Sequence, residues 1–173
     1  MAKEIRLLQP GDFILRRGTG LASLLIVNLL GGNTGISHSG VLYEDTNGEW
    51  FVIHSVSRAL SDHDGLQAES LKVFATNSVP GSTVIVRVRA SVEDREQIVR
   101  VAKDLLSQRV PFDPSFGLDN GAIYCSELLL LALPADIRQR TMVFQNPGNV
   151  IRFESFLDSR YFEIIVDKRA GAD

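Results

Sequence analysis

The sequence predicts an α+β fold, in which an antiparallel sheet packs against helices within a single domain spanning residues 1–173. Short strand-like stretches are grouped around residues 13–16, 37–43, 50–55, 83–89 and 161–166. Helical segments separate only some of them, so the order does not follow a regular βαβ repeat. No repeat or Pro/Ser-rich linker divides the chain, which favours one domain.

The N-terminal third begins with a strand and an apolar segment. Gly11-Asp12 introduces the strand at residues 13–16, and Gly18-Thr19-Gly20 leads into apolar residues 21–30. That segment is about half the length needed to span a bilayer. It predicts a buried helix, with contact at a membrane interface as the alternative and no integral membrane segment.

The next two strands form a hairpin. They flank residues 44–49, where Asn47-Gly48 is a strong turn signal.

The second half supplies a strand, two helices and a last strand. In the strand at 83–89, Val84, Val86 and Val88 alternate with arginines, so the valines are expected to face inward. Ser91 is expected to cap a helix, and a second helix beginning near Tyr124 is stopped by Pro134. Since no charge follows Glu127 until Asp136, this second helix is predicted to be central. Residues 141–159 predict little beyond a loop at 146–148.

Composition excludes several partner classes. The chain has 18 basic and 21 acidic residues and a net charge of -3 without a basic stretch, which argues against nucleic acid as a partner. One cysteine cannot form an intramolecular disulfide, and one thiol with three histidines lacks metal-site spacing, so no metal or cofactor is expected. The N-terminus has no secretory pattern, which predicts a cytoplasmic protein, with export as an effector as the alternative. The oligomeric state is not predicted.

Cys125 is the first candidate for chemistry. It follows the irregular, Gly- and Pro-containing residues 111–121 and directly precedes the leucine-rich helix. A helix N-terminus favours an anion, which lowers a thiol pKa, and its free N–H groups can hold an oxyanion. The alternative is a small buried apolar residue, which is the commoner state of a lone cysteine.

Two histidines could serve the thiol. His38 opens the first hairpin strand and could act as general base, and His54 in the second could orient it. Hydrogen-bonded edge histidines are the alternative. The two share a face only if opposed residue numbers add to an even constant. A two-residue turn pairing Thr46 with Glu49 gives 95, so we predict a longer loop or a bulge and a sum of about 92.

His63 lies in a polar turn between Asp62 and Asp64. We interpret it as a solvated loop residue, with a metal ligand or the third residue of the site as alternatives.

Taken in order, these segments resemble the circularly permuted NlpC-type group of papain-like cysteine peptidases and amidases (YiiX-like). The matching motifs are Gly11-Asp12-Phe13-Ile14, Ser37-His38-Ser39-Gly40-Val41, Val52-Ile53-His54-Ser55 and Tyr124-Cys125-Ser126-Glu127-Leu128. The resemblance implies a permuted papain-like fold in which the histidine strand precedes the cysteine helix.

The same resemblance implies roles for single residues. Cys125 would be the nucleophile, His38 the base and His54 the orienting residue, while Tyr124 and Ser126 would lie at the oxyanion or substrate. The third position is often an acid in YiiX-like proteins, whereas a histidine here is similar to the lecithin:retinol acyltransferase branch.

The function expected from these observations is a cysteine hydrolase that cleaves an amide, in a peptide or isopeptide, through a thioester at Cys125. One alternative is an acyltransferase or thioesterase acting on a lipid or acyl donor, with residues 21–30 near the lipid. Another is a non-catalytic module that binds an amino-acid-like ligand. The sequence does not predict the substrate or the acyl acceptor.

Overall fold

The computed structural model describes residues 2–58, 62, 64–141 and 150–169. His63 and the loop signals at 146–148 lie outside the described residues.

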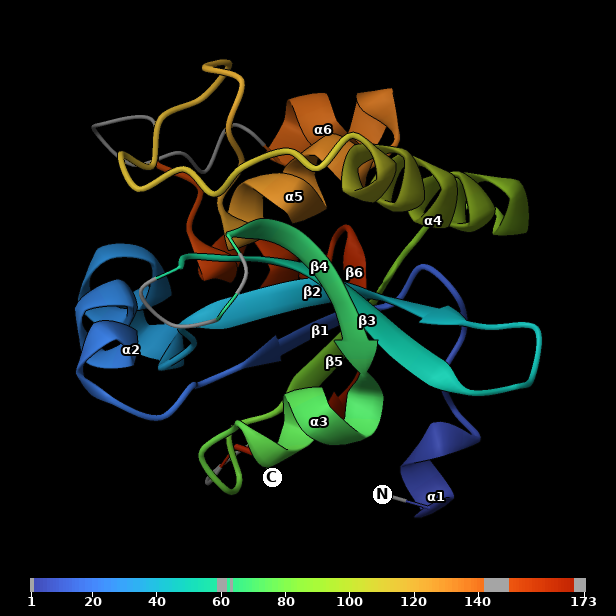
Figure 1. Cartoon of the computed structure of the whole chain (residues 1–173). Helices are drawn as coiled ribbons and strands as arrows, with labels where there is room; N and C mark the ends of the chain where they lie inside the picture. Colours follow the sequence, from blue (N-terminus) through green and yellow to red (C-terminus); the bar gives the residue numbers. More distant parts are fainter. Residues whose placement is uncertain (1, 59–61, 63, 142–149, 170–173) are drawn as a thin grey trace.

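A six-stranded sheet runs through the middle of the molecule (Figure 1). Neighbouring strands are antiparallel, in the order β4-β3-β2-β1-β5-β6. The strands are β1 (Phe13–Arg16), β2 (His38–Glu44), β3 (Trp50–Val56), β4 (Gly65–Ser70), β5 (Val84–Val88) and β6 (Phe162–Asp167).

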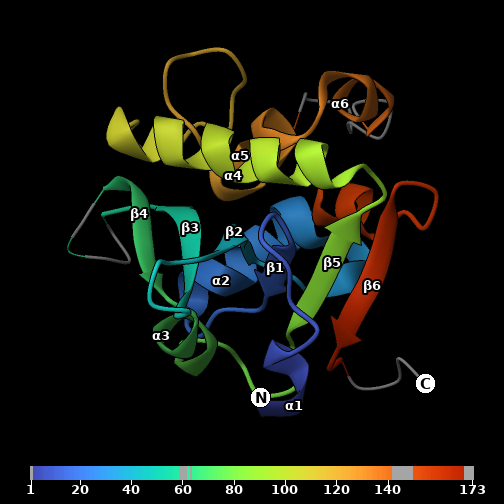
Figure 2. The same cartoon turned by 90° about the vertical axis from the view of Figure 1, so that its right-hand side faces the viewer.

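Helices cover both faces of this sheet. They are α1 (Ala2–Ile5), α2 (Leu21–Ile26), α3 (Leu71–Thr76), α4 (Val92–Ser107), α5 (Cys125–Ala132) and α6 (Ala135–Thr141). Figures 1 and 2 show α4 and α5 on one face and α3 on the other, with α2 at one end. A π-helical turn (Val27–Gly31) and 3-10 turns (Gly32–Thr34 and Phe153–Leu157) join these elements. The predicted α+β class, an antiparallel sheet packed against helices, is confirmed.

The core is divided between the two faces, because successive strand residues point to opposite sides. The face under α4 and α5, here called the α5 face, carries Val41, Ile53 and the predicted inward valines of β5. The opposite face, here called the α3 face, carries Leu42 and Val52 against Phe74 of α3.

The two long helices begin as their sequences predict. Ser91 Oγ accepts a hydrogen bond from Asp94 N at 3.1 Å and caps α4. At α5, Tyr124 is the N-cap and its N–H donates to Glu127 Oε2 at 3.4 Å. The buried leucines of α5 face the core, so this helix is central.

The hairpin also has the predicted parity. Val41 opposes Ile53 and Glu44 opposes Trp50, so opposed numbers add to 94. Five residues, 45–49, make the loop, closed by Asp45 N–H donating to the Glu49 carbonyl at 2.9 Å. The predicted even sum is confirmed, although the observed value of 94 is larger than the expected value of about 92.

Two predictions need correction. The apolar segment at residues 21–30 is not a buried helix: Leu21 and Leu25 are 81% and 71% exposed, because α2 lies at the end of the sheet. In addition, β4 was not predicted; it is a mostly polar strand that pairs with β3 along its whole length.

Candidate functional site

The structure brings His38 and His54 into direct contact. His38 Nε2 lies 2.8 Å from His54 Nδ1. Both rings project from the α3 face and contact the ring of Phe74, which stacks on His38 at 5.6 Å and meets His54 edge-on at 5.2 Å between centroids. The two strands and α3 therefore fix both imidazoles.

Glu69 of β4 extends this contact into a chain. Its Oε1 lies 3.3 Å from His54 Nε2. An ionised carboxylate only accepts hydrogen bonds, so His54 Nε2 carries the proton and Nδ1 is the acceptor. His38 then donates from Nε2, and its Nδ1 keeps a free lone pair. Gln67 Nε2 also lies 3.3 Å from His54 Nε2, and this tautomer requires the amide oxygen of Gln67 to face the ring.

Burial keeps both histidines neutral. It lowers the pKa of His54 to about 3, with the positive charge of Arg16 acting in the same direction. The pKa of His38 lies well below its usual value, first through burial and then through His54 and Arg16. Each ring therefore holds a single proton at neutral pH, as a general base requires.

A cavity of about 270 Å³ opens beside this histidine pair. Besides His38 and His54, its wall includes Arg16, Gln67, Glu69 and Asn77. We call it the site cavity.

Cys125 is the first residue of α5 and is 3% exposed. Its carbonyl accepts a hydrogen bond from Ser39 Oγ at 3.1 Å. Burial raises the pKa of the thiol to about 11, although the N–H groups of Ser126 and Ser39 and the Ser39 hydroxyl lower it in part. The expected depression of the thiol pKa is therefore wrong, because loss of solvent outweighs the helix N-terminus.

Cys125 contacts β2 at Ser39, the residue that follows His38. Ser39 contacts Cys125 on the α5 face, and strand alternation directs His38 to the α3 face. Within the described chain no hydrogen bond joins the sulfur to His38. The structure thus assembles His38, His54 and Glu69, and places Cys125 against the residue that follows His38.

Tyr124 and Ser126 both hold a distant segment. The Tyr124 hydroxyl accepts from Ile151 N at 3.0 Å, and Ser126 Oγ donates to the Ile151 carbonyl at 2.8 Å. Their side chains tie the start of α5 to residue 151. A role at the oxyanion would fall to backbone N–H groups.

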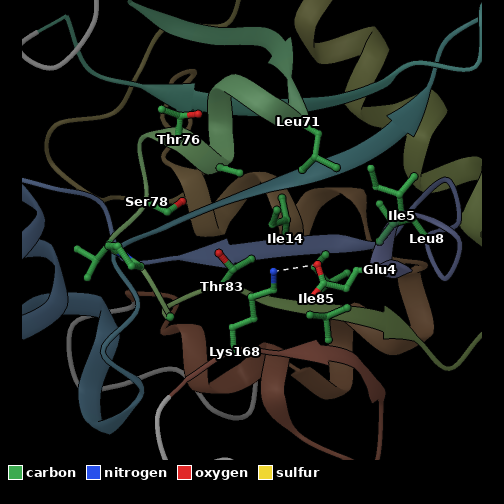
Figure 3. A pocket seen from close by; sticks show the side chains of 15 residues that line it. Glu4, Ile5, Leu8, Ile14, Leu71, Thr76, Ser78, Thr83, Ile85 and Lys168 are labelled. Atoms are coloured by element: carbon green, nitrogen blue, oxygen red, sulfur yellow. Dashed lines mark hydrogen bonds and ion pairs between the residues drawn. The ribbon is translucent and has the colours of Figure 1, made fainter. Parts of the chain in front are cut away.

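A second cavity, of about 300 Å³, lies elsewhere on the α3 face (Figure 3). Its wall is mainly apolar, with Ile14, Leu71 and Ile85 among the labelled side chains. Lys168 Nζ pairs with Glu4 Oε2 at 2.8 Å there. The two histidines line the site cavity and not this one, so the site cavity is the candidate for chemistry, although Cys125 lines neither.

Sequence analysis missed Arg16, Glu69 and Phe74. Arg16 ends the first predicted strand, and its Cα pairs with that of His38. Glu69 and Phe74 come from β4 and α3, which were not predicted. No hydrophobic alternation marks β4, so the sequence carried no clear signal for Glu69.

The comparisons with known proteins concern the fold. No protein-family model and no curated protein matched the chain. Among solved structures, the crystal structure of the metalloprotein YiiX from Escherichia coli O157:H7 matches with a TM-score of 0.69 and 20% sequence identity, covering 93% of this chain and 98% of YiiX. This structural neighbour gives its name to the YiiX-like group that the sequence motifs resemble, and the chain has a YiiX-like fold.

Proposed function

We propose that the chain is a papain-like cysteine hydrolase that cleaves an amide bond, with Cys125 as nucleophile and His38 as general base. One observation supports this most: the His38–His54–Glu69 chain leaves Nδ1 of His38 as a proton acceptor, one residue from the strand position that contacts Cys125. His54 and Glu69 act as positioning residues.

The reaction begins from two neutral groups, because the pKa of the thiol is raised and that of His38 is lowered. As sulfur attacks the carbonyl carbon, the thiol proton passes to His38 Nδ1, and the resulting imidazolium protonates the leaving amine. Water, deprotonated by His38, then hydrolyses the thioester. Backbone N–H groups at the start of α5 would stabilise the oxyanion. The proposal requires the sulfur to come within hydrogen-bonding distance of Nδ1 once substrate is bound.

YiiX carries the description metalloprotein, but the residues of this site do not suit a metal ion. No group of three His, Cys, Asp or Glu side chains within the described ranges could hold one. The 2.8 Å between His38 and His54 also suits a shared proton. The proposed reaction therefore uses protein side chains alone.

Intact-mass analysis with a set of thioester and activated-amide acyl probes tests the proposal. We expect one acyl adduct on the wild-type chain and none on Cys125→Ala. Labelling should slow about 100-fold or more in His38→Ala and less in Glu69→Gln, because Glu69 acts through His54. Ser107→Ala, at the exposed end of α4, is the control for effects of substitution and purification that do not involve the site.

Two results would contradict this assignment. Labelling that persists in Cys125→Ala would place the nucleophile elsewhere. A Cys125 that resists both the probes and iodoacetamide at neutral pH would favour the non-catalytic binding module, with which the raised thiol pKa agrees.

A second candidate is acyl transfer from or to a lipid. It is favoured by the exposed side chains Leu21, Leu24, Leu25 and Leu29 around α2, whose neighbour Ile26 lines the site cavity. No helix in the described part of the chain is long and apolar enough to cross a membrane. Sedimentation with phosphatidylcholine vesicles would support this candidate if the wild-type chain binds and Leu21→Ser/Leu25→Ser does not. Equal sedimentation of both proteins would exclude a role for α2.

A further inference from the structure

Arg16 is a buried cation in the wall of the site cavity. It is 8% exposed, and its guanidinium lies 4.4 Å from the centroid of the Phe74 ring. One of its terminal nitrogens, Nη1, donates to the Asn77 carbonyl. Its Nε is buried and has no hydrogen-bond partner. A guanidinium has five N–H donors, so this one is only partly satisfied.

The charge of Arg16 also lacks a contacting carboxylate in the described structure. Glu69 is the acid that shares the cavity, but its carboxylate is engaged with His54, and it acts on Arg16 only through space. Burial lowers the pKa of Arg16 to about 10, which still leaves it charged at neutral pH. A buried charge without a paired partner is costly unless a ligand supplies one.

We infer that Arg16 binds a free carboxylate of the substrate, which rests on the hydrolase function proposed above. The planar guanidinium fork matches a carboxylate and can hold it with two hydrogen bonds. Since Glu69 already contributes a negative charge to the cavity, a monoanion is favoured over a phosphate dianion.

The register of β1 against β2 then places that carboxylate relative to His38, the proposed base. Arg16 directly opposes His38 across β1 and β2. Opposed side chains in an antiparallel pair start about 5 Å apart. A carboxylate on Arg16 therefore lies beside His38. The substrate class is an amide whose scissile bond adjoins a free carboxylate, as in the last peptide bond of a chain, and a cavity of about 270 Å³ suits such a small end group.

Two ligands that differ only in charge test this inference. N-acetylglycine carries the carboxylate, and N-acetylglycinamide replaces it with a neutral amide. Both are titrated into Cys125→Ser, which binds without turnover, while the ¹⁵N signals of the His38 and His54 rings are followed by NMR. We expect saturable shifts with the carboxylate and affinity at least about tenfold weaker with the amide.

Variants of two neighbouring arginines locate the charge that is responsible. Arg16→Gln should lose about tenfold or more in affinity for N-acetylglycine, whereas Arg17→Gln, which removes a charge outside the cavity lining, should not. Equal binding of the two ligands, no binding of either, or unchanged binding in Arg16→Gln would overturn the inference. If Arg16→Gln does not fold, the comparison of N-acetylglycine with N-acetylglycinamide on Cys125→Ser still tests whether the cavity prefers a carboxylate. Because the readout needs no thiol, its failure is distinguishable from failure of Cys125 to react with acyl probes.

Discussion

The two faces of the sheet differ in how polar side chains are held near the start of β2. On the α5 face, Cys125 and Glu127 sit among leucines, and burial raises the pKa of both, to about 11 and about 7. On the α3 face, His54 is buried and His38 is half-buried, and they share a hydrogen-bonded chain that ends at Glu69. Burial favours the neutral form on both faces, so it keeps the Cys125 thiol protonated on the α5 face and the two imidazoles unprotonated on the α3 face.

This difference bears on the chemistry. A thiolate–imidazolium pair at rest would require solvent or strong hydrogen bonds around both groups. Here the Cys125 thiol stays protonated, and the neutral His38 imidazole can accept its proton. The site is therefore expected to ionise Cys125 only as the carbonyl is attacked, with His38 taking the proton.

The largest expected effect tests how much of the stability depends on the α5 face. Leu128 is fully buried in α5, so Leu128→Ala should leave a cavity and lower the free energy of unfolding by about 2–5 kcal/mol. Leu25→Ala, on the exposed side of α2, removes the same atoms and should change it by less than about 0.5 kcal/mol. Urea denaturation measures both. Similar losses would mean that α2 is packed against something in solution.

The next effect probes the α3 face at Gly40, which lies between the two histidines. A Cβ at this position would overlap a methyl of Val52, approach the Ile53 carbonyl oxygen to 2.7 Å and press on His54 Cβ at 3.1 Å. Gly40→Ala should therefore cost about 1–3 kcal/mol and shift the ring signals of His54. Unchanged stability together with unshifted ring signals would show that β2 and β3 are packed differently.

The contact between His38 and His54 could be predicted from the sequence because it depends on local backbone geometry. Strand alternation and the parity of the hairpin register follow from backbone geometry, so His38 and His54 could be assigned to one face. Glu69 could not be found, since β4 is a polar strand without the alternation that marks a buried one. The helix N-terminus at Cys125 is likewise a local signal, whereas the burial that raises its pKa depends on packing from distant residues.

The exposure of α2 shows the same limit. Apolar residues at 21–30 predict a segment that avoids water, but the sequence does not say whether another layer covers it. In the structure α2 lies at the end of the sheet, and several of its leucines face solvent.

The third effect is a change of stability with pH that arises from His54 on the α3 face. The pKa of His54 in the folded chain is about 3, below its unfolded value of about 6.5, so the unfolded chain binds more protons as pH falls between these values. Stability from His54 is thus complete above pH 6.5 and decreases toward pH 3. Between pH 7 and pH 5 the wild-type chain should lose about 1–2 kcal/mol through this group, and His54→Gln should not. Urea denaturation at both pH values measures the difference, and parallel pH profiles would contradict it.

The last effect runs in the opposite direction on the α5 face. The pKa of Glu127 is raised to about 7 by burial, so the folded chain holds this proton more tightly than the unfolded chain. The stability that results is complete below the ordinary glutamate value and is lost as pH rises through about 7. Glu127→Gln keeps an acceptor for Tyr124 N–H but carries no charge, so it should gain about 3 kcal/mol on the wild-type chain when pH goes from 4.5 to 8. Glu93→Gln, at an exposed position of α4, reports the loss of a surface charge alone. If Glu127→Gln instead becomes less stable at pH 8, the Glu127 carboxylate is stabilised in the folded chain and the contrast between the two faces is wrong.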